Sequence, residues 1–207
     1  MIFNDKEIER LILSIIVLSF AFMQSFYGKA EVFLFIISFV LTSLSYTFKQ
    51  IIHYLAGKKF GFNVEYKLWG PGTVLAAVSS LFPLTFAVLG YIEIKSKYHD
   101  HVDRHSTDVG PFTWEIPLGI RKALISYAGI MSNLLLGMIL LSFPLFDIYS
   151  LPLNIFKLGA FMNFSLALFN LLPVPDLDGI RVITYRASVW VLTTLMSLLL
   201  LIMVFII

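Results

Sequence analysis

The chain has 207 residues, of which 58% are hydrophobic and 14% are charged. A water-soluble domain cannot bury that much apolar surface, so the composition predicts a membrane protein that crosses the lipid bilayer several times. The absence of cysteine excludes disulfides and thiolate metal sites, and the net charge of +2 gives no indication of nucleic-acid binding. We expect one membrane domain over residues 1–207, with the bilayer as its surroundings.

Five apolar runs are long enough to cross a bilayer as helices, which predicts an all-α membrane fold. They cover about 8–27, 32–57, 122–146, 153–172 and 186–207. After the second run, Phe60–Leu68 is rich in β-branched and aromatic residues and predicts a short β segment near the membrane interface. A sixth apolar run, 73–92, contains Pro83 near its middle, so its path has to be decided on other grounds.

Lysine and arginine positions decide between two paths for 73–92, because these residues concentrate on the cytoplasmic side of membrane proteins. If all six runs span, six cations lie on the amino-terminal face and eight on the other. If 73–92 enters and returns as a re-entrant hairpin, twelve lie on the amino-terminal face, against Lys29 and Lys157 on the other. We therefore predict five spans plus the hairpin in the cell membrane, with the amino terminus cytoplasmic; six full spans is the alternative.

Two stretches of this arrangement carry polar side chains at the membrane. Phe169–Gly179, with sequence FNLLPVPDLDG, lies at the end of the run 153–172, and its two prolines prevent the helix from continuing. Lys49 and His53 are four residues apart in the second run, so they share a helix face, with Gln50 beside it. With five spans, both stretches lie at the same face of the membrane and can form one site; with six, they lie on opposite faces.

Two motifs in these stretches, and a third in the run 122–146, resemble those of the site-2 protease family, which are intramembrane zinc metalloproteases. His53–Gly61, HYLAGKKFG, is similar to the end of the family's zinc-binding helix, where the motif begins His-Glu-x-x-His. FNLLPVPDLDG is similar to the Asn-x-x-Pro and Leu-Asp-Gly motif that supplies the third zinc ligand. Ala128–Asn133 is similar to Ala-Gly-Pro-x-x-Asn, with Ile130 in place of proline.

The resemblance also shows where the chain departs from the family. It implies that His53 and Asp178 stand at metal-ligand positions, whereas Lys49 stands at the first histidine and Gln50 at the catalytic glutamate. A zinc hydrolase needs three protein ligands and a general base for the bound water. An ammonium group has no lone pair and an amide is not a base, so we expect weak or absent zinc binding and no peptide hydrolysis.

We hypothesise that the Lys49 ammonium replaces the metal charge and pairs with Asp178 beside His53. The same pocket is expected to contain Asn133, Asn170 and Pro173. The predicted function is that of a catalytically inactive relative, a pseudoprotease, that binds transmembrane segments of other proteins or a partner.

Two alternatives remain open. The chain is an active intramembrane metalloprotease if it recruits other ligands, and the candidates are His99, His101, Asp103 and His105, which alternate along one polar stretch. It is a small proton-coupled transporter if Lys49, His53 and Asp178 form a proton relay.

Overall fold

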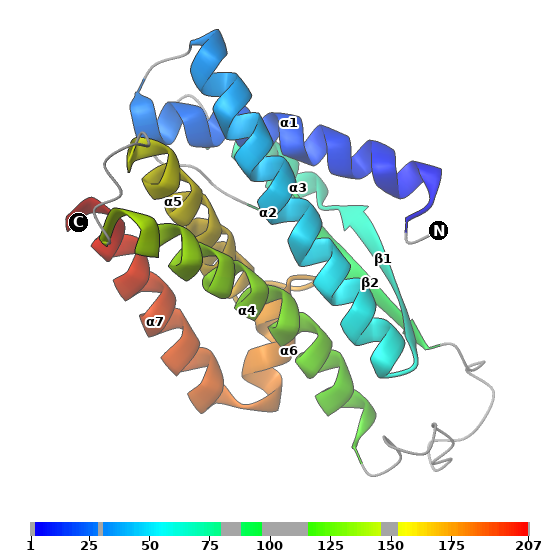
Figure 1. The fold of residues 1–207 in the computed structure, drawn as a ribbon. Helices are drawn as coiled ribbons and strands as arrows, with labels where there is room; N and C mark the ends of the chain where they lie inside the picture. The colour runs from blue at the N-terminus through cyan, green and yellow to red at the C-terminus, as the bar shows by residue number, and fades with distance from the viewer. Residues whose placement is uncertain (1–2, 29–30, 80–87, 97–115, 146–152, 207) are drawn as a thin grey trace.

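The computed structural model describes residues 3–28, 31–79, 88–96, 116–145 and 153–206. These residues form seven helices and two strands (Figure 1). In chain order the elements are α1 (Asp5–Tyr27), α2 (Val32–Lys59), β1 (Phe62–Leu68), α3 (Gly70–Ser79), β2 (Gly90–Ser96), α4 (Leu118–Leu145), α5 (Leu153–Asn170), α6 (Asp178–Tyr185) and α7 (Ala187–Ile206).

Four helices of the described chain are long and apolar enough to cross a membrane: α1, α2, α4 and α7. The outward faces of α2 and α7 carry exposed hydrophobic side chains such as Phe33 and Leu192, which are 70% and 66% exposed. The prediction of a helical membrane protein from composition is therefore confirmed. The predicted run 153–172 forms α5, whose apolar part, Ile155–Asn170, is shorter than a full span.

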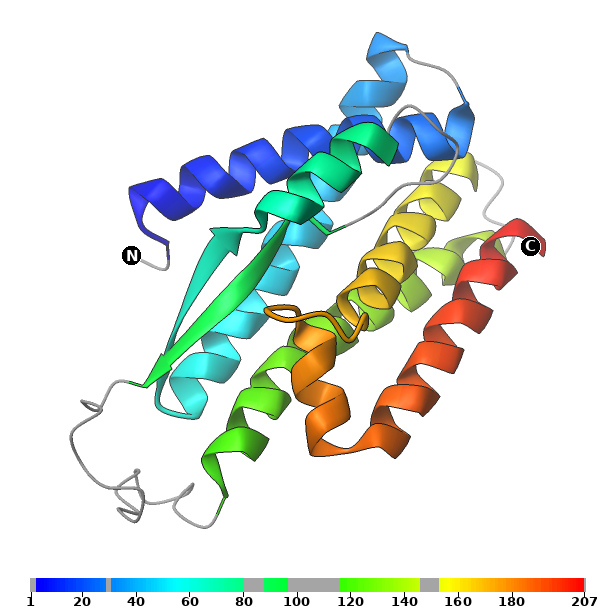
Figure 2. The ribbon, with the colours of Figure 1, turned by 180° about the vertical axis from the view of Figure 1, so that it is seen from behind.

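Helices α2, α4 and α5 pack together at the middle of the molecule. Helix α1, α3 and the two strands lie on one side of this layer, and α7 lies on the other, packed on α5 (Figures 1 and 2). The buried face of α2 is polar along most of its length, and Tyr46 is its only buried hydrophobic side chain. The other buried residues are Ser38, Thr42, Ser45, Lys49, Gln50, His53 and Gly57. This face positions charged and amide groups in the interior of the bundle.

The apolar run 73–92 is divided between a helix and a strand. Helix α3 takes up its first part and β2 begins at Gly90, while Pro83 lies outside the described residues. Strand β2 pairs antiparallel with β1, with Leu68 opposite Gly90, and the Trp69 amide donates to the Leu89 carbonyl at 2.8 Å. Trp69 and Leu89 therefore lie side by side, so the chain returns at Leu89 to the place that it leaves at Trp69.

The strand predicted over 60–68 is confirmed as β1, whereas its partner β2 was not predicted. Both strands alternate apolar and polar residues, as expected for strands with one buried face. Phe62 and Tyr66 of β1 and Ile92 and Ile94 of β2 are buried, whereas the intervening Glu65, Lys67, Glu93 and Lys95 form ion pairs on the other face. The alternation in β2 is short and adjoins an apolar run, which hides it in the sequence.

Side chains of α1 cover the outer edge of β1. The Tyr66 amide donates to Glu7 Oε1 at 2.9 Å, and Arg10 donates to the Tyr66 carbonyl at 3.1 Å. Since Tyr66 and Ile92 face each other in a pair without mutual hydrogen bonds, these backbone groups point away from β2. Glu7 and Arg10 thus satisfy both backbone groups of Tyr66, at the middle of this edge.

Candidate functional site

The turn between α5 and α6 positions Asp178. Helix α5 ends at Asn170, before Pro173, and the backbone of Asp176 is left-handed with φ 73°. The turn passes close to its own start: a Cβ on Gly179 would lie 2.2 Å from the Leu171 carbonyl oxygen, so glycine is required there. Asp178 is the first residue of α6, where the positive end of the helix dipole favours a carboxylate.

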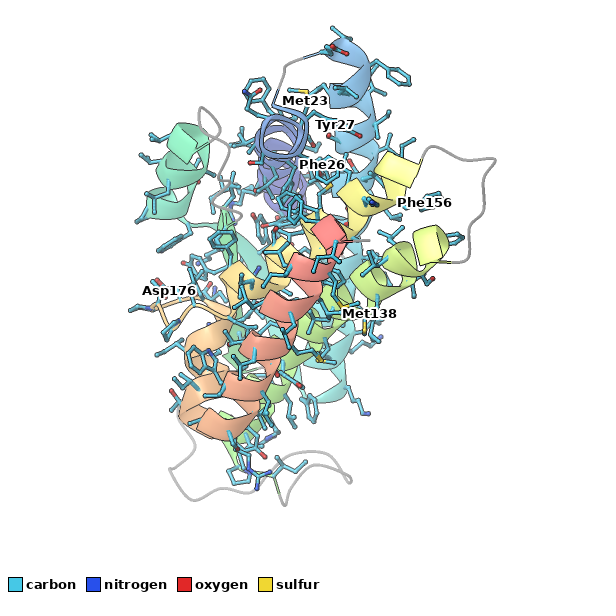
Figure 3. All side chains as sticks on the ribbon, turned by 90° about the vertical axis from the view of Figure 1, so that its left-hand side faces the viewer. Met23, Phe26, Tyr27, Met138, Phe156 and Asp176 are labelled. Atoms are coloured by element: carbon cyan, nitrogen blue, oxygen red, sulfur yellow. The ribbon has the colours of Figure 1, made fainter. Side chains whose placement is uncertain are left out.

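Trp190 of α7 holds this turn from the other side. Its indole Nε1 donates to the Leu171 carbonyl at 2.6 Å, so the same oxygen contacts both α7 and the start of α6. Asp176 lies on the outside of the turn and points away from the helices (Figure 3). The turn therefore directs one of its two aspartates inward and the other outward.

Lys49 and His53 of α2 reach the inward carboxylate. Lys49 Nζ and His53 Nε2 each lie 3.5 Å from the same Asp178 oxygen, Oδ2. Lys49 also donates to Asn170 Oδ1 at 2.7 Å, and the Asn170 amide donates in turn to the Leu166 carbonyl at 2.6 Å. The side chains of Lys49, His53 and Asp178 are 3%, 0% and 4% exposed, so the cluster is almost fully removed from solvent.

Helix α4 closes the cluster with a glycine. A Cβ on Gly129 would lie 1.6 Å from His53 Nε2, so the imidazole packs directly on the α4 backbone. Asn133 is one turn further along the same face of α4 and is fully buried. Both polar atoms of its amide, and both ring nitrogens of His53, lack hydrogen-bond partners among the described residues. The cluster thus contains buried donors and acceptors that its own side chains do not satisfy.

Arg181 supplies a second positive charge that sequence reasoning did not include. Its NH1 lies 3.6 Å from Asp178 Oδ1 and donates to Ser126 Oγ at 3.3 Å, while NH2 donates to the Ile92 carbonyl at 3.1 Å. One guanidinium therefore links α6 to α4 and to β2. Its spacing of three residues from Asp178 on a helix is the signal that could have identified it.

The donor set does not fit a zinc site. Tetrahedral zinc in a hydrolase takes three protein ligands and a water, and in this cluster only His53 and Asp178 offer lone pairs of the required kind. No group of three or more His, Asp or Glu side chains comes together in the part of the chain that the structure describes. The Lys49 ammonium lies beside Asp178 Oδ2, offers no lone pair and repels a divalent cation.

The structure brings four of the expected site residues, Lys49, His53, Asn170 and Asp178, into one cluster. Gln50 is buried one position along α2. Pro173 is exposed, so its role is to end α5 and not to line the cluster. The alternative ligands His99, His101, Asp103 and His105 lie outside the described residues.

Fold and site together define a helical membrane protein with a buried cluster of charged and amide side chains near the end of one spanning helix. A protein of Methanocaldococcus jannaschii named "Putative zinc metalloprotease" is 26% identical to this chain over 197 residues, covering 93% of this chain and 91% of that protein. No family model and no solved structure matches the chain. The similarity over nearly the full length, with the apolar helices, supports a metalloprotease-like membrane protein.

Proposed function

We propose that this chain is a site-2 protease-like membrane protein that does not hydrolyse peptides and instead binds a segment of another membrane protein. The observation that carries the proposal is the contact of Lys49 Nζ with Asp178 Oδ2 at 3.5 Å, beside His53. In the family that the motifs resemble, these positions would hold a metal ion between imidazole and carboxylate. Here the chain supplies its own positive charge.

The chemistry of the remaining groups supports the absence of hydrolysis. A buried carboxylate that already interacts with two cations, Lys49 and Arg181, is less available to a third. Gln50 cannot accept a proton from water, so the position of the general base is not filled by a base. The cluster is instead a charge-balancing element, because either charge alone would be costly inside the bundle.

The edge of β2 that faces away from β1 supports the binding function. The outward backbone groups of β2 fall at Gly90, Ile92 and Ile94, on the side of α6, and no strand pairs with this edge in the described chain. The Ile92 carbonyl there is joined through Arg181 to Asp178. An extended segment of a partner that displaces Arg181 from the Ile92 carbonyl could add to the sheet at this edge, next to the cluster of Lys49, His53 and Asp178.

The proposal includes five spans, a re-entrant excursion and a cytoplasmic amino terminus in the cell membrane. It is supported by the return of the chain after Trp69–Leu89 and by the charge distribution. Because the chain has no cysteine, single cysteines can be introduced at Lys6, Glu31, Lys59 and Arg186. We expect an impermeant maleimide to label Glu31→Cys from outside intact cells and the other three only after lysis; labelling of Lys59→Cys together with Glu31→Cys would contradict it.

Metal content tests the central claim. We expect the purified protein to contain no stoichiometric zinc, and the double variant Lys49→His, Gln50→Glu to bind close to one zinc per chain by elemental analysis. Adding His53→Gln to that double variant should abolish the binding, which shows that the metal occupies the cluster. Stoichiometric zinc in the unmodified protein that is lost on His53→Gln or Asp178→Asn would refute the proposal.

That last result would instead favour the second candidate, an active zinc metalloprotease. The name of the Methanocaldococcus jannaschii protein is the observation that favours it. Cleavage of a model transmembrane substrate by the unmodified protein, inhibited by a zinc chelator, would establish this function.

A further inference from the structure

Two of the candidate spanning helices begin at the same end of the molecule. Helices α4 and α7 both start there, and α6 lies between their first turns (Figures 1 and 2). Because the apolar spans begin at Leu118 and Ala187, residues just before and within these first turns lie where the helices enter the apolar layer. This is the level at which lipid headgroups meet the protein.

A groove of about 590 Å³ opens at this level between the start of α4 and α6. Its walls are mostly apolar and are formed in part by Pro117, Ile120, Ile180 and Tyr185. Its only charged lining residues are two cations, Lys122 and Arg181. A smaller hollow of about 170 Å³ lies on the other side of Tyr185 and is lined in part by Arg186. Tyr185 lines both hollows, so they lie next to each other on the surface.

Charge on this feature has one sign. None of the residues that line either hollow is acidic. Arg181 is engaged with Asp178, Ser126 and Ile92, as described above. Lys122 and Arg186, by contrast, form no ion pair with any residue that the structure describes, and Arg186 is exposed. The surface thus combines apolar walls with positive charge that is not balanced within the described chain.

We infer that this groove binds an anionic phospholipid, with its phosphate near Lys122 and Arg186 and an acyl chain along the apolar walls. A soluble anion would need the cations but not the walls, and an uncharged lipid would need the walls but not the cations. The position at the start of two spanning helices makes a bilayer lipid the ligand that meets both requirements without leaving the membrane. The inference is independent of whether the protein hydrolyses peptides.

Lipid retention in native mass spectrometry tests the inference. The full-length protein in detergent is mixed with equal amounts of phosphatidylglycerol and phosphatidylcholine that carry the same acyl chains. We expect preferential retention of phosphatidylglycerol, and a loss of that preference by roughly fivefold for each cation removed in Lys122→Gln, Arg186→Gln. The matched control is Lys58→Gln, Lys59→Gln, which removes the same charge from the end of α2, outside the groove.

Three results would overturn the inference. The first is equal retention of the two lipids by the unmodified protein. The second is an equal loss of preference in the control pair, which would indicate a general charge effect. The third is displacement of phosphatidylglycerol by glycerol phosphate, which carries no acyl chain. The exposed position of Arg186 and the partly exposed position of Lys122 allow both substitutions without disturbing the core.

Discussion

Gly129 of α4 lies against His53 of α2 so closely that a single added methyl group would overlap the imidazole ring. The Cβ of alanine would fall 1.6 Å from Nε2 and 2.3 Å from Cδ2. The ring is fully buried and in contact with Asp178, so it cannot move aside into solvent. The approach of the two helices therefore fixes the orientation of the histidine.

Gly129→Ala should lower the free energy of unfolding by about 2 kcal/mol or more, because the substitution overfills a packed helix contact. Gly119→Ala is the matched control in the same helix, since an added Cβ there meets nothing within 4 Å. We expect the control to change stability by less than about 0.5 kcal/mol. Thermal unfolding of both variants in detergent checks this, and equal effects would mean that the contact is not tight in the protein.

Lys49 and Asp178 should be energetically coupled. Lys49→Met leaves the carboxylate buried with Arg181 as its remaining cation, and we expect a loss of about 3 kcal/mol. On an Asp178→Asn background the same substitution should cost much less, because no buried charge is left unpaired. A double-mutant cycle on unfolding free energies measures this coupling, and additive losses would show that the two groups do not depend on one another.

Asp176 should tolerate glycine better than a β-branched residue. Its φ of 73° is costly for an L-residue and most costly for a branched one, while its side chain is exposed and points outward (Figure 3). We expect Asp176→Gly to be within about 0.5 kcal/mol of the original protein and Asp176→Val to lose about 1–2 kcal/mol. If thermal unfolding gives equal values for the two, the turn does not require a left-handed residue.

Tyr66 should make stability depend on pH in the alkaline range. Burial raises the pKa of its phenol to about 12, although hydrogen bonds with Ser14 and Tyr46 and the charge of Arg10 oppose the shift. The folded state thus favours the neutral phenol, so the stabilisation is complete below pH 10 and is lost as pH rises from about 10 to about 12. Unfolding free energies of the original protein and Tyr66→Phe should show a steeper decline over this window for the original; parallel curves would contradict the shift.

The long helices could be predicted from the sequence because a long apolar run is stable in lipid only as a helix. It also predicted that α2 and the turn after α5 meet, since the charge distribution favoured a path that brings both to one face. The contact of Lys49, His53 and Asp178 follows from that path. The roles of these side chains remain a proposal.

Other features depend on tertiary contacts that local patterns do not reveal. Strand β2 exists because β1 pairs with it, and its buried residues adjoin an apolar run that masks their alternation. Helix α6 is short and was not predicted, although Arg181 lies at helical spacing from Asp178. Gly129 was noted within a motif, but only the structure shows that His53 requires it.

Glu7 and Arg10 bind the edge of β1, so the two edges of the sheet are not equivalent. A two-stranded sheet with both edges free could join copies of the protein end to end, in the manner of aggregating strands. Since one edge is already occupied by α1 side chains, any added strand must enter beside α6, and a guest at that edge cannot itself recruit a copy through β1. Growth of the sheet beyond β1 is therefore opposed by α1 side chains.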